Sequence, residues 1–160
     1  MVGTCGDACT DVNDNPDFTA TRKDRMLPPA NVQKETLGTT LGIEIVEVTR
    51  ERVVARMPVV PRVHQPFGVL HGGASVALAE TVASMAGWMN VDQARETVVG
   101  IEINANHLRA KRDGVVTATA TPAHIGRRTQ VWDVRITDES GKAICVSRCT
   151  LAVVPRSNEG

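Results

Sequence analysis

The chain has few of the features that mark proteins acting on nucleic acids or membranes. Its 18 Lys and Arg residues balance 18 Asp and Glu residues, so no excess of charge attracts either kind of partner. No apolar run approaches the roughly 20 residues needed to span a bilayer. The N-terminal stretch MVGTCGDACTDVNDNPD has neither a basic flank nor an apolar core, unlike a secretory signal peptide. We therefore expect a cytoplasmic enzyme or binding protein.

Cysteine is also scarce, and its spacing disfavours a metal site. The four cysteines form two pairs, Cys5 with Cys9 and Cys145 with Cys149. The second pair lies in a strand-like stretch, where residues four apart share one face at about 13 Å, too far apart to bind one ion. We predict that no metal is bound and that Cys145 and Cys149 are small core residues. Cys5 and Cys9 are expected to be free thiols.

A chain of 160 residues is long enough for one domain with a real core. Residues 1–30 are polar and end in Leu27-Pro28-Pro29, which predicts a flexible extension. The domain is expected to span residues 31–155, with a tail at 156–160. A short helix could occupy residues 31–37. The alternation in GIEIVEVTRERVVARMPVV predicts a β-hairpin turning at residues 49–51, and residues 61–70 must form a loop.

The remaining chain predicts one helix followed by strands. Residues 73–90 are small or apolar around nearly the whole circumference of a helix, which indicates a buried helix. Four strand-like stretches follow in meander-like succession, at residues 97–109, 114–126, 128–140 and 142–154. A helix that is apolar all round must be wrapped by a sheet or buried at an interface. The predicted class is α+β, with an antiparallel sheet around one long central helix.

Glu80 is the one acidic residue inside that apolar helix. A buried carboxylate is costly unless it is paired, hydrogen-bonded or chemically useful. An ion pair with Arg or Lys is as good an explanation as catalysis. Ser84 lies one turn later on the same face, where its hydroxyl could orient the carboxylate or an attacking water.

The start of the helix offers a complementary group. Gly72 and Gly73 leave the first helical amides unshielded, and these amides can hold an anion or a developing oxyanion. His71 and Gln65 stand just before them. Each residue also has a plain structural explanation: close packing for the glycines, capping for His71, and bracing of the loop for Gln65. Together they supply the parts of an acyl-transfer site.

The length of the helix restricts how these parts can cooperate. Gly72 and Glu80 are eight residues apart, about 12 Å along one helix. One carbonyl group can hardly lie near 3 Å from both. If both act on one substrate, two copies of the helix must face each other, as in a two-fold dimer.

The segment QPFGVLHGGASVALAE, followed by Thr81, Ser84 and GIEINANHLR, resembles the hotdog-fold acyl-CoA thioesterases. It is most similar to the small bacterial aryl-CoA type, which includes the 4-hydroxybenzoyl-CoA, phenylacetate-pathway and 1,4-dihydroxy-2-naphthoyl-CoA thioesterases. The resemblance covers residues 35–155 and implies the hotdog fold. It also implies hydrolysis of an acyl-CoA to free acid and coenzyme A, in a dimer with shared sites that commonly pairs into a tetramer. No separate cofactor is implied.

The resemblance assigns roles to individual residues. Glu80 would be the nucleophile or the general base, and the Gly72 amide would polarise the thioester carbonyl. Gln65 and His71 would contact the thioester, and Ser84 would position water. The expected binding residues for coenzyme A and the acyl group are Phe67, Gly73, Val82, Met85, His107, Arg109, Gly126 and Arg127, with Trp88 as a further candidate for the acyl pocket. A hotdog dehydratase or hydratase, or a non-catalytic acyl-CoA-binding protein, is the alternative.

Overall fold

The computed structural model describes residues 35–156. The predicted flexible extension at residues 1–30, with Cys5 and Cys9, lies outside the described residues. Of the short helix expected at residues 31–37, residues 35 and 36 are not helical. The first described helix, α1 (Leu37–Leu41), begins one residue after Thr36, whose Oγ1 accepts a hydrogen bond from the Thr39 amide at 3.3 Å. A reciprocal bond from the Thr36 amide to Thr39 Oγ1 completes a capping box and fixes this start.

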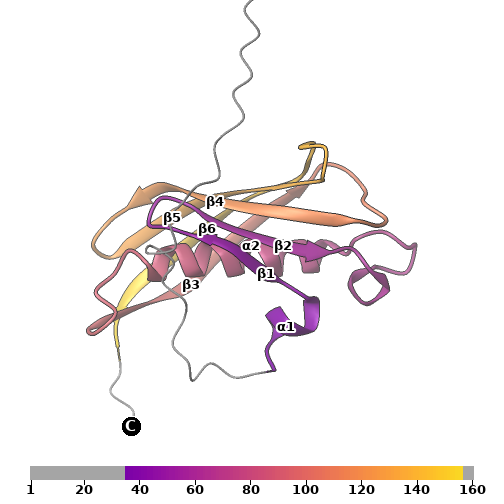
Figure 1. The fold of residues 1–160 in the computed structure, drawn as a ribbon. Coiled ribbons are helices and arrows are strands. Elements are labelled where there is room, and N and C mark those ends of the chain that lie inside the picture. The colour runs from indigo at the N-terminus through magenta and orange to yellow at the C-terminus, as the bar shows by residue number, and fades with distance from the viewer. Residues whose placement is uncertain (1–34, 157–160) are drawn as a thin grey trace, which may run out of the picture.

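Six antiparallel strands form one sheet, which Figure 1 shows laid over a single long helix, α2 (Gly72–Trp88). The strands are β1 (Glu44–Val48), β2 (Val53–Pro58), β3 (Glu96–His107), β4 (Val115–Ile125), β5 (Thr129–Thr137) and β6 (Ala143–Pro155). The loop before α2 contains one short 3-10 turn, Pro61–Val63. The architecture is the α+β arrangement predicted above, with each predicted strand and the long helix present.

The order of the strands differs from the predicted meander. Along the sheet the order is β1-β2-β4-β5-β6-β3, so of the four strands that follow α2 only β4, β5 and β6 are neighbours in chain order. β3 pairs with β6, from Glu96 opposite Pro155 to His107 opposite Cys145. The other edge of β4 is occupied by β2 of the first hairpin. The prediction of a continuous meander was therefore wrong for β3, which lies at an edge of the sheet.

The helix is also less enclosed than predicted. Its buried residues repeat in pairs every four positions and face the sheet: Ala74, Ser75, Leu78, Ala79, Val82, Ala83, Ala86 and Gly87. The opposite face, which carries Val76, Ala77 and Glu80, is partly or fully exposed. Alanine and glycine make both faces apolar in sequence, yet this chain covers only one of them. The prediction that the helix is buried on all sides was wrong for the single chain.

The C-terminal half of α2 is held close to the sheet. Gln130, fully buried on β5, donates from Nε2 to the Gly87 carbonyl at 3.3 Å and accepts from Trp132 Nε1 at 3.0 Å. A Cβ atom on Gly87 would collide with Leu151 Cδ1. Only glycine allows this close approach.

Cys145 and Cys149 are buried free thiols on β6, as predicted for small core residues. Burial raises the pKa of Cys145. Burial first, and then the charges of Glu80 and Glu102, raise the pKa of Cys149 to about 11. Both thiols therefore stay protonated near neutral pH.

No helix within residues 35–156 has the length and apolar character to cross a membrane.

Candidate active site

The N-terminus of α2 presents one free amide, that of Gly72, beside a histidine ring. His71 caps the helix, because its Nδ1 accepts a hydrogen bond from the Gly73 amide at 2.8 Å. The amide of Gly72 has no acceptor within residues 35–156. A Cβ atom on Gly72 would lie 2.8 Å from His107 Nε2, so glycine lets the imidazole approach the helix end. The site thus offers an unpaired donor at the positive end of a helix.

A cavity of about 350 Å³ opens beside this amide. It brings together four of the predicted site residues, Gln65, Gly72, His107 and Arg109. Gln65 Oε1 accepts a hydrogen bond from the Phe67 amide at 2.8 Å, which braces the loop and leaves the side-chain NH₂ available as a donor. The guanidinium of Arg109 donates to the Ala143 carbonyl at 2.6 Å.

Phe67 is 84% exposed in the same loop, so in a single chain it covers nothing. Gly73 is exposed as well, next to the capping histidine. These two predicted binding residues therefore lie at the mouth of the site.

Glu80 lies on the open face of α2 and is exposed, contrary to the predicted burial. Its carboxylate makes no ion pair with any residue between 35 and 156, so a salt bridge within this part of the chain does not explain the acid. The carboxylate faces β3, where a Cβ atom on Gly100 would lie 3.0 Å from Oε1. Glu80 is thus a free carboxylate resting against the edge strand.

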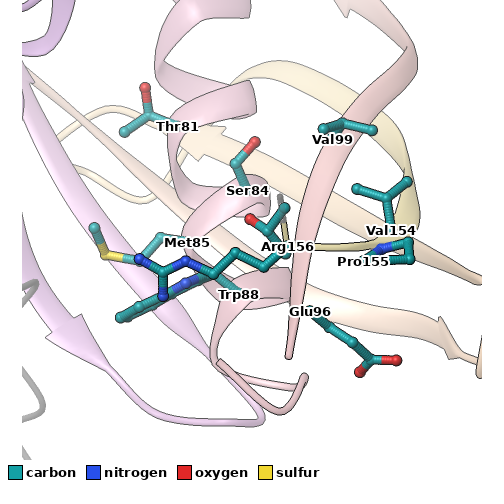
Figure 2. Close-up of a pocket in the computed structure, with 10 residues that line it drawn as sticks. Thr81, Ser84, Met85, Trp88, Glu96, Val99, Val154, Pro155 and Arg156 are labelled. Carbon is teal, nitrogen blue, oxygen red and sulfur yellow. The ribbon is translucent and has the colours of Figure 1, made fainter. Parts of the chain in front are cut away.

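A larger cavity of about 810 Å³ continues from Glu80 toward the C-terminus of α2. Figure 2 shows Thr81, Ser84, Met85 and Trp88 along its helical side, while Val99, Val154 and Pro155 stand opposite on the strands. Glu96, Thr97 and Arg156 complete the lining. Val82, by contrast, is fully buried against the sheet and lies outside this cavity. The lining is mostly apolar, with the Ser84 and Thr81 hydroxyls at the end nearest Glu80.

The two cavities share no residue. One contains the Gly72 end of α2 and the other begins beyond Glu80, so the chain has two separate cavities along this helix.

The residues predicted to bind coenzyme A are also divided. His107 and Arg109 lie at the end of β3, opposite Cys145 of β6. Gly126 and Arg127 lie in the β4–β5 turn, whose next residue, Arg128, accepts from the Val153 amide. Cys145 and Val153 are eight residues apart on β6, which corresponds to about 26 Å along the strand. A single chain does not bring the two groups together.

The two basic residues that follow Arg109 and Ala110 make contacts within the chain. Lys111 forms an ion pair with Glu139 at 2.6 Å, and Arg112 donates to the Phe67 and Gly68 carbonyls at 3.4 Å. Among the described residues, no group of three or more His, Cys, Asp or Glu side chains could hold a metal ion.

Gly100 and Arg156 were not predicted from the sequence as residues of these cavities or their edges. Gly100 interrupts the alternation of β3, and a glycine inside a strand pattern is a signal for a bulge or a close approach. Arg156 carries no such signal, because it falls beyond the alternating part of β6.

A long helix laid against a six-stranded antiparallel sheet is the arrangement of the hotdog fold. Residues 67–145 match the Thioesterase superfamily, and the chain belongs to this family.

Similar proteins carry the same activity in their names. The 1,4-dihydroxy-2-naphthoyl-CoA hydrolase of Listeria monocytogenes is 54% identical over 114 residues, covering 71% of this chain and 92% of that one. A crystal structure of a mutant thioesterase from Pseudomonas aeruginosa superposes with a TM-score of 0.77 at 48% identity, covering 82% and 98%. A thioesterase from Haemophilus influenzae gives 0.75 at 49% identity, covering 79% and 89%. The chain is therefore a thioester hydrolase.

Proposed function

We propose that the chain hydrolyses an acyl-CoA thioester, with an aromatic acyl group, to the free acid and coenzyme A. The observation that carries this proposal is the pair of uncommitted groups on α2, the Glu80 carboxylate and the Gly72 amide. Neither has a partner within residues 35–156, although each lies at the edge of a cavity. A free acid and a free oxyanion donor are what acyl transfer requires.

In the proposed mechanism, the thioester carbonyl oxygen accepts a hydrogen bond from the Gly72 amide, which stabilises the negative charge that develops as the carbonyl is attacked. Glu80 either attacks the carbonyl carbon, giving a mixed anhydride that water then hydrolyses, or removes a proton from a water molecule that attacks directly. Ser84, one turn beyond, would hold that water. The C–S bond breaks and coenzyme A leaves as a thiolate, a leaving group good enough to need no metal or other cofactor.

We propose that the working site is shared between two chains. Among the strands within residues 35–156, β3 is an edge strand with no neighbour on its outer side, and three large apolar side chains are exposed on or just after it, Val99, Ile101 and Leu108. Such an edge favours pairing with another strand. A second copy along this edge would also cover the open face of α2. The Gly72 amide of one chain could then meet Glu80 of the other, which the 12 Å helix spacing forbids within one chain.

The mass of the protein in solution tests this arrangement. Light scattering should give twice the 17.2 kDa of the chain, or four times that mass if dimers pair as the family resemblance implies. A monomer that retains full activity would contradict the shared site.

An aromatic acyl group fits the larger cavity. Met85, Trp88 and Val99 provide apolar walls, and a volume of about 810 Å³ lies within the usual range for a small-molecule site. The Listeria relative is named for a naphthoyl-CoA substrate, which supports the same class.

A thiol-release assay over benzoyl-, phenylacetyl-, naphthoyl- and straight-chain-CoA tests the proposal, with a protein blank for the four cysteines. Release of thiol, fastest with the aromatic esters, is expected. Loss or gain of a conjugated double bond without thiol would indicate the hydratase alternative. Binding of the esters without turnover would indicate a non-catalytic protein.

A further inference from the structure

Gly100 lies in the middle of β3, at the point where Glu80 touches the sheet. Its pairing partner on β6 is Leu151, which is fully buried, so a side chain at position 100 would point to the α2 side of the sheet. A Cβ atom placed there would lie 3.0 Å from Glu80 Oε1. Beyond the adjacent backbone, no other heavy atom of the described residues is within 4 Å of that position. The carboxylate alone therefore occupies the space that a side chain would take.

Backbone conformation does not explain this glycine. The described glycines with a positive φ are Gly42, Gly68, Gly114 and Gly141, and Gly100 is not among them. A glycine inside a strand weakens the strand, because it has no side chain to pack and loses more entropy on folding. What glycine provides at position 100 is therefore room.

The strand is irregular at the same place. Gly100 pairs with Leu151 and Glu102 with the next residue back, Thr150, so Ile101 is an extra residue in β3. A bulge of this kind bends the strand, and bulges are common beside active sites, where they redirect a side chain. The sheet thus departs from regular pairing where it meets Glu80.

We propose that Gly100 is a positioning residue for Glu80. By lacking a side chain, it lets the carboxylate rest against the backbone of β3 and so fixes where the acid stands relative to the thioester. This inference rests on the proposed function, in which Glu80 reacts with the substrate or activates water.

The proposed role of Gly100 differs from that of Gly87, which is needed for packing of the core. A Cβ atom on Gly87 would collide with the packed side chain of Leu151, so a substitution there strains the core. At position 100, the atom that a Cβ would meet is Oε1 of Glu80, the free end of a flexible side chain. Alanine there should move the carboxylate and leave the fold intact.

The test compares Gly100→Ala with the wild type in the full-length protein. Thiol release should show kcat falling about three- to tenfold, since the carboxylate must give way by a few tenths of an ångström and a misplacement of about 1 Å can cost about a hundredfold. KM, the melting temperature and the mass in solution should stay close to the wild-type values. Gly38→Ala is the matched control, because a Cβ atom there meets only Thr36 Oγ1, at an ordinary 3.6 Å. It should leave kcat unchanged.

A kcat within twofold of the wild type would overturn the inference, as would a fall in kcat that follows a fall in melting temperature or a loss of the dimer. A crystal structure of Gly100→Ala adds a measurement independent of turnover: a displaced Glu80 carboxylate supports the inference and an unmoved one refutes it. If the wild type releases no thiol from any ester, the proposed function fails instead, and the position of the carboxylate still decides the role of Gly100.

Discussion

The two faces of α2 both carry small and apolar residues, but their surroundings differ. On the face toward the sheet, Leu78, Ala79 and Val82 are fully buried in the core. On the other face, Val76 and Ala77 are equally apolar but only partly covered, and they lie one turn before the exposed Glu80. The first face holds the domain together by excluding water. The second is apolar without being covered, which indicates a surface that works against something outside this chain.

One helix can thus serve stability on one face and chemistry on the other. A substitution on the sheet side should cost folding free energy and leave the chemistry of the folded molecules largely intact. A substitution on the open side should do the reverse, because those side chains have few partners within the chain. A variant on either face that changed both kcat and the free energy of unfolding would show that the two roles are not separate.

Glu80→Gln should have the largest effect. It keeps the size of the side chain and removes the group that attacks or takes a proton, so kcat should fall about 10²- to 10⁴-fold. Because the carboxylate is exposed and makes no ion pair with the described residues, the melting temperature should hardly change. Thiol release and thermal unfolding measure the two effects. The control is Glu44→Gln, an exposed acid on β1. Near-normal turnover of Glu80→Gln would remove Glu80 from the mechanism.

Leu78→Ala tests the other face. The side chain is fully buried between α2 and the sheet, so its removal should lower the free energy of unfolding by about 2–5 kcal/mol. Val76→Ala, two residues earlier on the open face, should lower it by less than about 1 kcal/mol in the same urea titrations. Equal losses in the two variants would show that the open face is as tightly packed as the sheet side.

The sequence predicted the elements of this fold because their patterns are local. Alternation marks every strand, and the predicted helix at residues 73–90 differs from the observed α2 by at most two residues at each end. The position of β3 beside β6 could not be predicted, because alternation says nothing about which strands become neighbours. The exposure of Glu80 was missed for a related reason. Alanine and glycine make both faces of the helix apolar, so the pattern cannot tell which face the same chain covers.

The candidate site shows the same contrast between what local sequence patterns predict and what tertiary pairing decides. Gln65, Gly72, His107 and Arg109 meet in one cavity, and the first two are close in sequence to the helix start. His107 and Arg109 come from the end of a strand whose place is set by tertiary pairing. Gly126 and Arg127 share their basic surroundings but lie at the other end of the sheet. The basic residues in both segments suggested one binding site, but charge in the sequence does not show how far apart two segments lie in the fold.

Cys149 offers the smallest and most selective test, because this buried thiol on β6 is affected by a charge on the open face. Burial, and then Glu80 and Glu102, raise its pKa from 9.0 to about 11. A thiol with a raised pKa in the folded state contributes stability that is complete below about pH 9 and is lost as the pH rises toward 11. The free energy of unfolding should therefore fall over this interval, and it should fall less steeply in Cys149→Ala, as urea titrations at pH 8 and 10.5 would show. Glu80→Gln should make the fall shallower but not abolish it, because burial is the larger cause. If Glu80→Gln changed nothing, the charge on the open face would not reach the core, and the two faces of α2 would be electrostatically independent.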